Sequence, residues 1–130
     1  AVNDICARTV DSFCRNNVEK ATHIEPLEEV IDTLCKTIKE NHIKRLKKGK
    51  STIEMGFILD DVLTGLERVS DHCSNIAVEM ITILDDDFDT HEYFESLSGE
   101  DRKNFNKEYE ELIKQYPISK KEIEQSKNAQ

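Results

Sequence analysis

The chain has 130 residues, of which 35% are charged and only four are glycine and two proline, and its formal net charge is −9. A domain of this length can bury most of its unfolded surface, and the scarcity of helix breakers and strand-forming runs predicts an all-α fold. The acidic balance argues against a nucleic-acid partner, and no apolar run approaches the roughly 20 residues of a membrane span, so we expect a soluble domain.

The first two predicted elements are helices over residues 2–15 and 17–47, in which apolar residues recur at helical spacing. Pro26 lies inside the second helix, where a proline removes a backbone hydrogen bond and clashes with the preceding turn. Two interpretations are open. Either the helix kinks near Thr22, which we favour, or a fresh helix begins with Pro26 at its first position.

The stretch LKKGKST predicts the end of that helix, with Gly49 as a left-handed cap and Ser51 with Glu54 as a new capping box. A third helix is expected over 52–84. Its apolar stripe advances in steps of three and four, which is typical of bundle packing. The stripe contains Met55, Ile58 or Leu59, Val62, Leu66, Val69, Cys73, Ile76, Met80 and Ile83. Because a short turn joins the two long helices, we expect them to be antiparallel neighbours.

The acidic and aperiodic residues 85–98 predict a loop, and a last helix is expected over 98–115, ended by Pro117. We therefore expect a helical bundle over residues 1–116 and a polar tail over 117–130. The four cysteines form no CxxC pair and lie at or beside apolar helical positions, so we expect free thiols.

Basic residues crowd the turn between the two long helices: Lys44, Arg45, Lys47, Lys48 and Lys50. They complement the negative end of the helix dipole and favour solubility, which is the simpler explanation. They could also contact anionic lipid headgroups or a phosphate.

Two pairs of acidic residues each lie one helical turn apart, Glu28 with Asp32 and Glu67 with Asp71. Both pairs are equally far from the turn at Gly49, so the antiparallel register places Glu28 opposite Asp71 and Asp32 opposite Glu67. Converging carboxylates raise one another's pKa unless a cation lies among them. Such a site would hold a divalent or trivalent ion: iron, manganese, magnesium, calcium or zinc. Alternatively, the four acids face water or meet nearby basic residues.

The stretches EPLEEVIDTL, NHIKRLKKGKST and LERVSDHCSNIA, within residues 1–84, resemble the PhoU family, whose repeats are three-helix bundles with metal-binding E(D)xxxD motifs. The region from HIKRL to SDHCSNIA is particularly similar to the PhoU-like cytoplasmic C-terminal domain of bacterial sodium/phosphate cotransporter family proteins. The resemblance implies an antiparallel three-helix bundle with an additional C-terminal helix and a non-catalytic regulatory role in phosphate uptake. Glu28 and Asp32 match the first motif, and Glu67 and Asp71 match the second.

Full members of the family carry two repeats, whereas this sequence has one, which implies a piece of a longer transporter or a half that forms a homodimer. The implied partner is a membrane transporter domain of the same or an associated protein, and the implied location is the cytoplasmic face of the membrane. Two alternatives are a metal-independent helical interaction module and, with less support, a metal-dependent phosphoesterase. The sequence has no glycine-rich phosphate loop, GxSxG elbow or HExxH motif.

Overall fold

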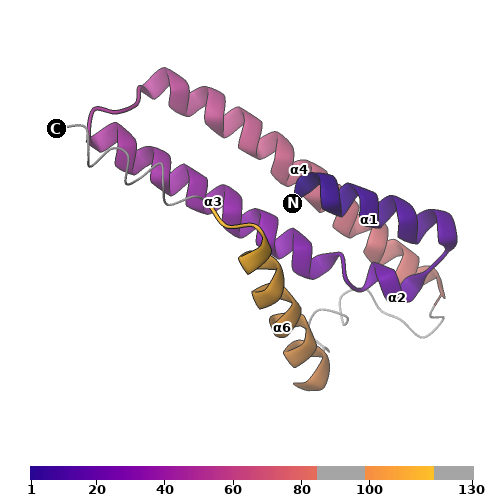
Figure 1. Cartoon of the computed structure of the whole chain (residues 1–130). Helices are drawn as coiled ribbons and strands as arrows, with labels where there is room; N and C mark the ends of the chain where they lie inside the picture. Colours follow the sequence, from indigo (N-terminus) through magenta and orange to yellow (C-terminus); the bar gives the residue numbers. More distant parts are fainter. Residues whose placement is uncertain (85–98, 119–130) are drawn as a thin grey trace.

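The computed structural model describes residues 1–84 and 99–118, and every regular element among them is a helix (Figure 1). The helices are α1 (Val2–Arg15), α2 (Val18–Ala21), α3 (Glu25–Lys47), α4 (Ile53–Leu84) and α6 (Gly99–Gln115). α3 and α4 form a long antiparallel hairpin, α1 packs along α4, and α6 packs against α3 (Figure 1). The predicted all-α bundle with an additional helix is confirmed.

The connection between α1 and α3 differs from the predicted one. Asn16 ends α1 in the left-handed conformation with φ 50°, and the Asn17 side chain caps the single turn of α2 by accepting a backbone hydrogen bond at 2.9 Å. α3 then begins afresh with Pro26 in its first turn. The predicted continuous helix over 17–47, kinked near Thr22, is therefore wrong. In a first turn proline loses only an N–H that has no helical partner, so a new start is less costly than a kink.

The turn between α3 and α4 contains the predicted glycine but a different cap. Gly49 is left-handed, with φ 66°. Thr52, rather than the predicted Ser51, caps α4, because its Oγ1 accepts a hydrogen bond from the Met55 backbone N–H at 3.3 Å. The Ser51 hydroxyl instead lies 3.4 Å from Nδ1 of His42.

The two arms of the hairpin approach closely near this turn, where His42 of α3 faces Gly56 of α4. The His42 side chain is buried, and a Cβ added at Gly56 would lie 2.8 Å from its Nε2 atom. The absence of a side chain at Gly56 therefore makes room for the imidazole ring. This contact fixes how both helices are rotated about their axes at this end of the molecule.

The hydrophobic core lies between α3, α4 and α1, and α6 adds one residue to it. Its buried members are Ile5, Ala21, Ile24, Leu27, Val30, Ile31, Cys35, Leu63, Cys73, Ala77, Met80, Ile81 and Leu112. The structure holds all four cysteines as free thiols, two of them within this core.

The predicted apolar stripe of α4 is only partly the side that faces the core. Cys73 and Met80 are buried, but other members of the stripe are between 38% and 72% exposed: Met55, Ile58, Val62, Val69, Ile76 and Ile83. Small residues occupy the neighbouring buried positions, among them Ser70, Ser74 and Ala77. Because small side chains let adjacent helices approach closely, the core forms on that side and leaves a second apolar side of α4 uncovered.

α6 is held against the bundle by one buried leucine and two tyrosines. Leu112 is buried, the Tyr116 hydroxyl donates a hydrogen bond to Oδ2 of Asp4 at 2.7 Å, and the Tyr109 hydroxyl lies 3.0 Å from Oγ1 of Thr33. These contacts join α6 to the start of α1 and the middle of α3.

Two sequence predictions fall largely outside the described part of the chain: the loop over 85–98 and the polar tail over 117–130, of which 117 and 118 alone are described. Across residues 1–84 and 99–118, no helix combines the length and the apolar character needed to cross a membrane.

Candidate metal centre

Three of the four predicted acidic residues converge across the α3–α4 hairpin. Glu28 and Asp32 come from α3, and Asp71 comes from α4. One carboxylate oxygen from each of these three residues lies within 4.8 Å of the others. The expected juxtaposition of Glu28 with Asp71 is therefore present.

Further contacts show the same register along the hairpin. The Ser74 hydroxyl donates a hydrogen bond to Oε2 of Glu25, and Nζ of Lys39 lies 3.3 Å from Oδ1 of Asp60. Each of these pairs is equally far along the chain from the turn, as the acidic pairs are. The helices thus keep one register from the cluster as far as Lys39 and Asp60.

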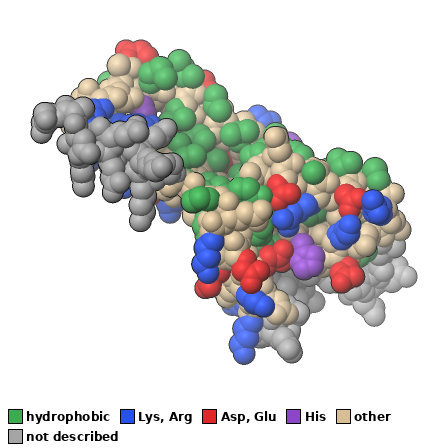
Figure 2. Space-filling view, in the orientation of Figure 1, with side chains coloured by type: hydrophobic (Ala, Val, Ile, Leu, Met, Phe, Trp, Pro, Cys, Tyr) green, Lys and Arg blue, Asp and Glu red, His purple; other side chains and the backbone are tan. Residues whose placement is uncertain are grey.

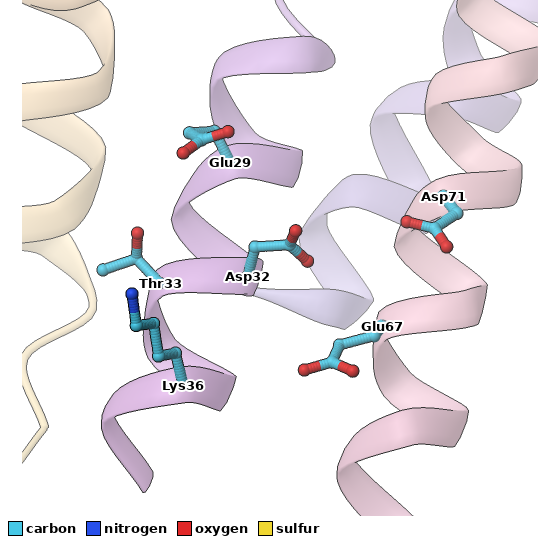
Figure 3. A pocket seen from close by; sticks show the side chains of 6 residues that line it. All are labelled: Glu29, Asp32, Thr33, Lys36, Glu67 and Asp71. Atoms are coloured by element: carbon cyan, nitrogen blue, oxygen red, sulfur yellow. The ribbon is translucent and has the colours of Figure 1, made fainter. Parts of the chain in front are cut away.

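Glu67, the fourth predicted ligand, lies one turn from Asp71 and has a basic partner. Nζ of Lys39 lies 3.3 Å from Oε1 and 3.4 Å from Oε2 of Glu67. Figure 3 shows the Glu67 carboxylate on the same side of α4 as that of Asp71, directed toward α3. The structure therefore gathers three of the four predicted residues in one cluster and places the fourth beside it, paired with a lysine.

The acids border a hollow of about 440 Å³ between the two helices (Figure 3). Its lining residues are Glu29, Asp32, Thr33, Lys36, Glu67 and Asp71. Asp32 points across the hollow toward Asp71 and Glu67 (Figure 3). Asp32 and Asp71 are exposed and Glu28 is half-buried, so an ion could reach the carboxylates from solution.

The cluster carries strongly perturbed acids. Burial raises the pKa of Glu28 to about 8, and the charges of Asp32, Glu25 and Asp71 add to the increase. Burial also raises the pKa of Asp32, with further contributions from Asp71 and Glu67. Full ionisation of the cluster is therefore unfavourable, and a cation among the carboxylates would remove the repulsion.

Glu25 is a fifth acidic residue at this site, and the sequence analysis did not single it out. It lies one turn before Glu28, burial raises its pKa, and the hydrogen bond from Ser74 opposes that increase. Extending the mirrored register by one turn would have placed Glu25 opposite Ser74. The mirrored register therefore carries a signal for Glu25, whose partner is a serine rather than a second acid.

Three converging carboxylates fit a single hard cation. Calcium and magnesium bind oxygen ligands at about 2.0–2.6 Å, so two oxygens on one ion lie roughly 3–5 Å apart. The three carboxylate oxygens lie within 4.8 Å of one another, which is inside that limit. Oxygen-only ligands also suit manganese and iron. An ion held here would tie α3 to α4, and the open hollow leaves room for water or another ligand.

Comparisons with known proteins give the family of the chain. The PhoU domain family model matches residues 1–80. One relative is the phosphate-specific transport system accessory protein PhoU homolog 1 of Thermotoga maritima, which is 29% identical over 72 residues. That match covers 55% of this chain and 31% of the relative, so the chain spans about a third of the relative's length. No solved structure matches the chain. Because the family model covers more than half of its residues, the chain belongs to the PhoU domain family.

Proposed function

We propose that this chain is a non-catalytic regulatory domain in phosphate uptake, acting on a sodium/phosphate cotransporter-type membrane protein at the cytoplasmic face of the membrane. Family membership supports the regulatory role, and the Thermotoga relative is named as an accessory protein of phosphate-specific transport. The likeness of the HIKRL to SDHCSNIA region to cotransporter C-terminal domains supports this type of transporter. The partner is the membrane domain of the same or an associated protein.

The same proposal includes a metal ion bound by Glu28, Asp32 and Asp71, with Glu67 as a fourth ligand. The convergence of three carboxylates within 4.8 Å across the hairpin is the observation that carries it. Magnesium, calcium, manganese and iron fit the oxygen ligands best, and zinc is the remaining candidate.

Ion binding would change how firmly the two arms of the hairpin, α3 and α4, are held together. Without a cation, repulsion among the acids pushes α3 and α4 apart at this level, and Lys39 neutralises Glu67 one turn away. With a cation, Glu28 and Asp32 of one arm bind the same ion as Asp71 of the other. The domain would then present a more rigid hairpin to its transporter partner.

Self-association is also part of the proposal, because a second apolar side of α4 is uncovered. Figure 2 shows hydrophobic side chains gathered along this helix. Phe13, Ile76 and Ile83 are 65%, 42% and 72% exposed, and they line a mostly apolar hollow of about 430 Å³. A contiguous apolar surface of this kind is typical of an interface, and a homodimer would cover it. Sedimentation should show a dimer, and a monomer at high micromolar concentration would contradict this part of the proposal.

The exposed side of α4 also favours the alternative function, a helical interaction module that needs no metal. Thermal unfolding with and without divalent ions separates the two. Under metal binding, manganese at a hundredfold excess over its dissociation constant should stabilise the fold by about 2.7 kcal/mol, and chelator should reverse the gain.

Two variants of α4 make this test specific. Asp71→Asn removes one charge at nearly constant size, so it should lose the metal-dependent gain while its metal-free form is as stable as the parent or more so. Asp61→Asn makes the same chemical change at an exposed position of α4 and should respond like the parent. An Asp71→Asn protein with the parent's metal response would leave the interaction module as the better account.

The regulatory role is tested in cells that express the transporter together with the parent or the Asp71→Asn chain. When the variant replaces the parent, phosphate uptake should no longer be regulated as it is with the parent chain. Uptake that is the same with the parent, the variant or no chain at all would contradict the role. Phosphoesterase turnover by the purified chain with manganese would instead favour the enzyme alternative.

A further inference from the structure

The end of the hairpin that carries the α3–α4 turn has a charge opposite to that of the whole chain. Five basic residues lie within residues 43–57, and Glu54 is the one acid there, although the chain as a whole has a net charge of −9. Figure 1 shows this turn projecting beyond α1 and α2, on the side of the hairpin away from α6. We call residues 43–57 the hairpin tip.

Most cations of the tip have no acidic partner in the described part of the chain. Side chains of Lys44, Arg45, Lys47 and Lys48 make no ion pair or hydrogen bond with any residue in 1–84 or 99–118. Some basic residues elsewhere are paired with acids: Arg8 lies 2.9 Å from Asp4, and Lys39 lies 3.3 Å from Asp60. The helix dipole favours the cations in the last turn of α3 and Lys48 at its C-cap, but it leaves them without an acidic partner among the described residues.

Large apolar side chains are exposed at the same end. Ile43, Ile53, Met55 and Phe57 are 50%, 61%, 55% and 70% exposed. The contact of His42 with Gly56 fixes the rotation of both helices here. Each following residue is turned by about 100° around its helix, and because the helices are antiparallel, Ile43 and Phe57 turn to the same side of the hairpin.

We propose that the hairpin tip binds the surface of a membrane that contains anionic lipid. The lysines and Arg45 contact the headgroups, and the exposed apolar residues beside them, Phe57 foremost, enter the layer between headgroups and acyl chains. The acidic remainder of the chain is repelled by the same surface. The domain would therefore contact the membrane through the hairpin tip alone, with α6 directed away from it. This inference does not depend on the metal site.

A membrane fits the tip better than a nucleic acid does. A duplex presents a continuous row of phosphates that would repel the acidic body of the domain, and phosphate contacts make no use of exposed isoleucine and phenylalanine. An anionic bilayer offers both a charged plane that a small tip can reach and an apolar layer just beneath it.

The chain has no tryptophan, so Phe57→Trp would introduce a single fluorescent reporter at the tip. The reporter protein is mixed with vesicles of phosphatidylcholine alone or of phosphatidylcholine with phosphatidylglycerol. Co-sedimentation and a blue shift of the tryptophan emission should occur with the anionic vesicles, and added salt should weaken both. Binding that is equal for neutral and anionic vesicles, or absent from both, would overturn the proposal.

A matched pair of triple variants locates the binding surface. Lys44→Gln, Lys47→Gln and Lys48→Gln remove three charges from the tip, and because each basic residue near such a surface adds about fivefold to binding, roughly a hundredfold loss is expected. The control removes the same charge from α6, at the exposed Lys103, Lys107 and Lys114, and should change binding by only a few fold.

Three further outcomes would count against a lipid surface as the partner. The first is an equal loss of binding in the α6 variant, which would point to overall charge. The second is competition by millimolar inorganic phosphate, which would indicate a site for a free anion. The third is tip-dependent binding of duplex DNA as tight as that of the vesicles. Circular dichroism and the midpoint of thermal unfolding serve as the folding control, and the tip variant should match the parent in both.

Discussion

Replacing Glu28 with glutamine tests the electrostatics of the acidic cluster directly. Burial and the surrounding acids raise the pKa of Glu28 from 4.5 to about 8, so the folded protein binds this proton more tightly than the unfolded chain does. The stabilisation that follows is fully present below pH 4.5, declines as the pH rises from 4.5 to about 8, and is gone above that. Glutamine cannot ionise and removes this pH dependence.

The size of the effect follows from the pKa shift and from the exposure of the side chain. Without screening, the shift would correspond to about 5 kcal/mol between the two ends of the pH range. Glu28 is only half-buried, and solvent screening reduces this to about 2 kcal/mol. The Glu28→Gln protein should therefore match the parent near pH 4.5 and exceed its free energy of unfolding by about 2 kcal/mol above pH 8.

The assay is urea unfolding, followed by circular dichroism, across this pH range in the presence of chelator. Glu40→Gln is the matched control, since it makes the same change at an exposed position of α3 and should follow the parent within about 0.5 kcal/mol. A Glu28→Gln protein that is less stable than the parent above pH 8 would show that Glu28 is not held in a repulsive cluster. The same conclusion would follow if the free energy of unfolding of the variant fell with pH as steeply as that of the parent.

Two further predictions concern the helices that position the cluster. Gly56→Ala places a Cβ 2.8 Å from Nε2 of the buried His42 and should lower the free energy of unfolding by about 1 kcal/mol, whereas Gly65→Ala, with nothing within 4 Å, should raise it by up to about 1 kcal/mol. Equal effects of the two substitutions in chemical denaturation would contradict the close contact. Asn17→Ala removes the side chain that accepts the Lys20 backbone hydrogen bond and should cost about 1 kcal/mol; no change in thermal unfolding would show that the α2 cap is dispensable.

The register of the hairpin could be predicted from sequence because one turn determines it. Once Gly49 marks the turn between two long helices, antiparallel packing decides which residues face one another, and the Glu28 and Asp71 carboxylates meet as expected. The contact of Lys39 with Asp60 obeys the same rule. These features depend on chain geometry and helical periodicity, both of which the sequence carries.

Other features could not be predicted, because the sequence is compatible with two arrangements that it favours about equally. Pro26 is compatible with a kink or with a fresh helix, and the structure has the fresh helix, with Pro26 in its first turn. α4 has apolar residues on two sides, and close approach at Ser70 and Ala77 selects the side that is buried. The pairing of Glu67 with Lys39 depends on side-chain rotamers, which periodicity does not predict.

The central claim is that Glu28, Asp32 and Asp71, assisted by Glu67, hold a cation between α3 and α4. The most direct measurement is elemental analysis of the parent and of Asp71→Asn, purified in parallel without chelator or nickel resin. The parent should carry stoichiometric manganese, iron, magnesium, calcium or zinc, and the variant should carry little. A parent chain without bound metal, or an Asp71→Asn chain with the same metal content, would contradict it.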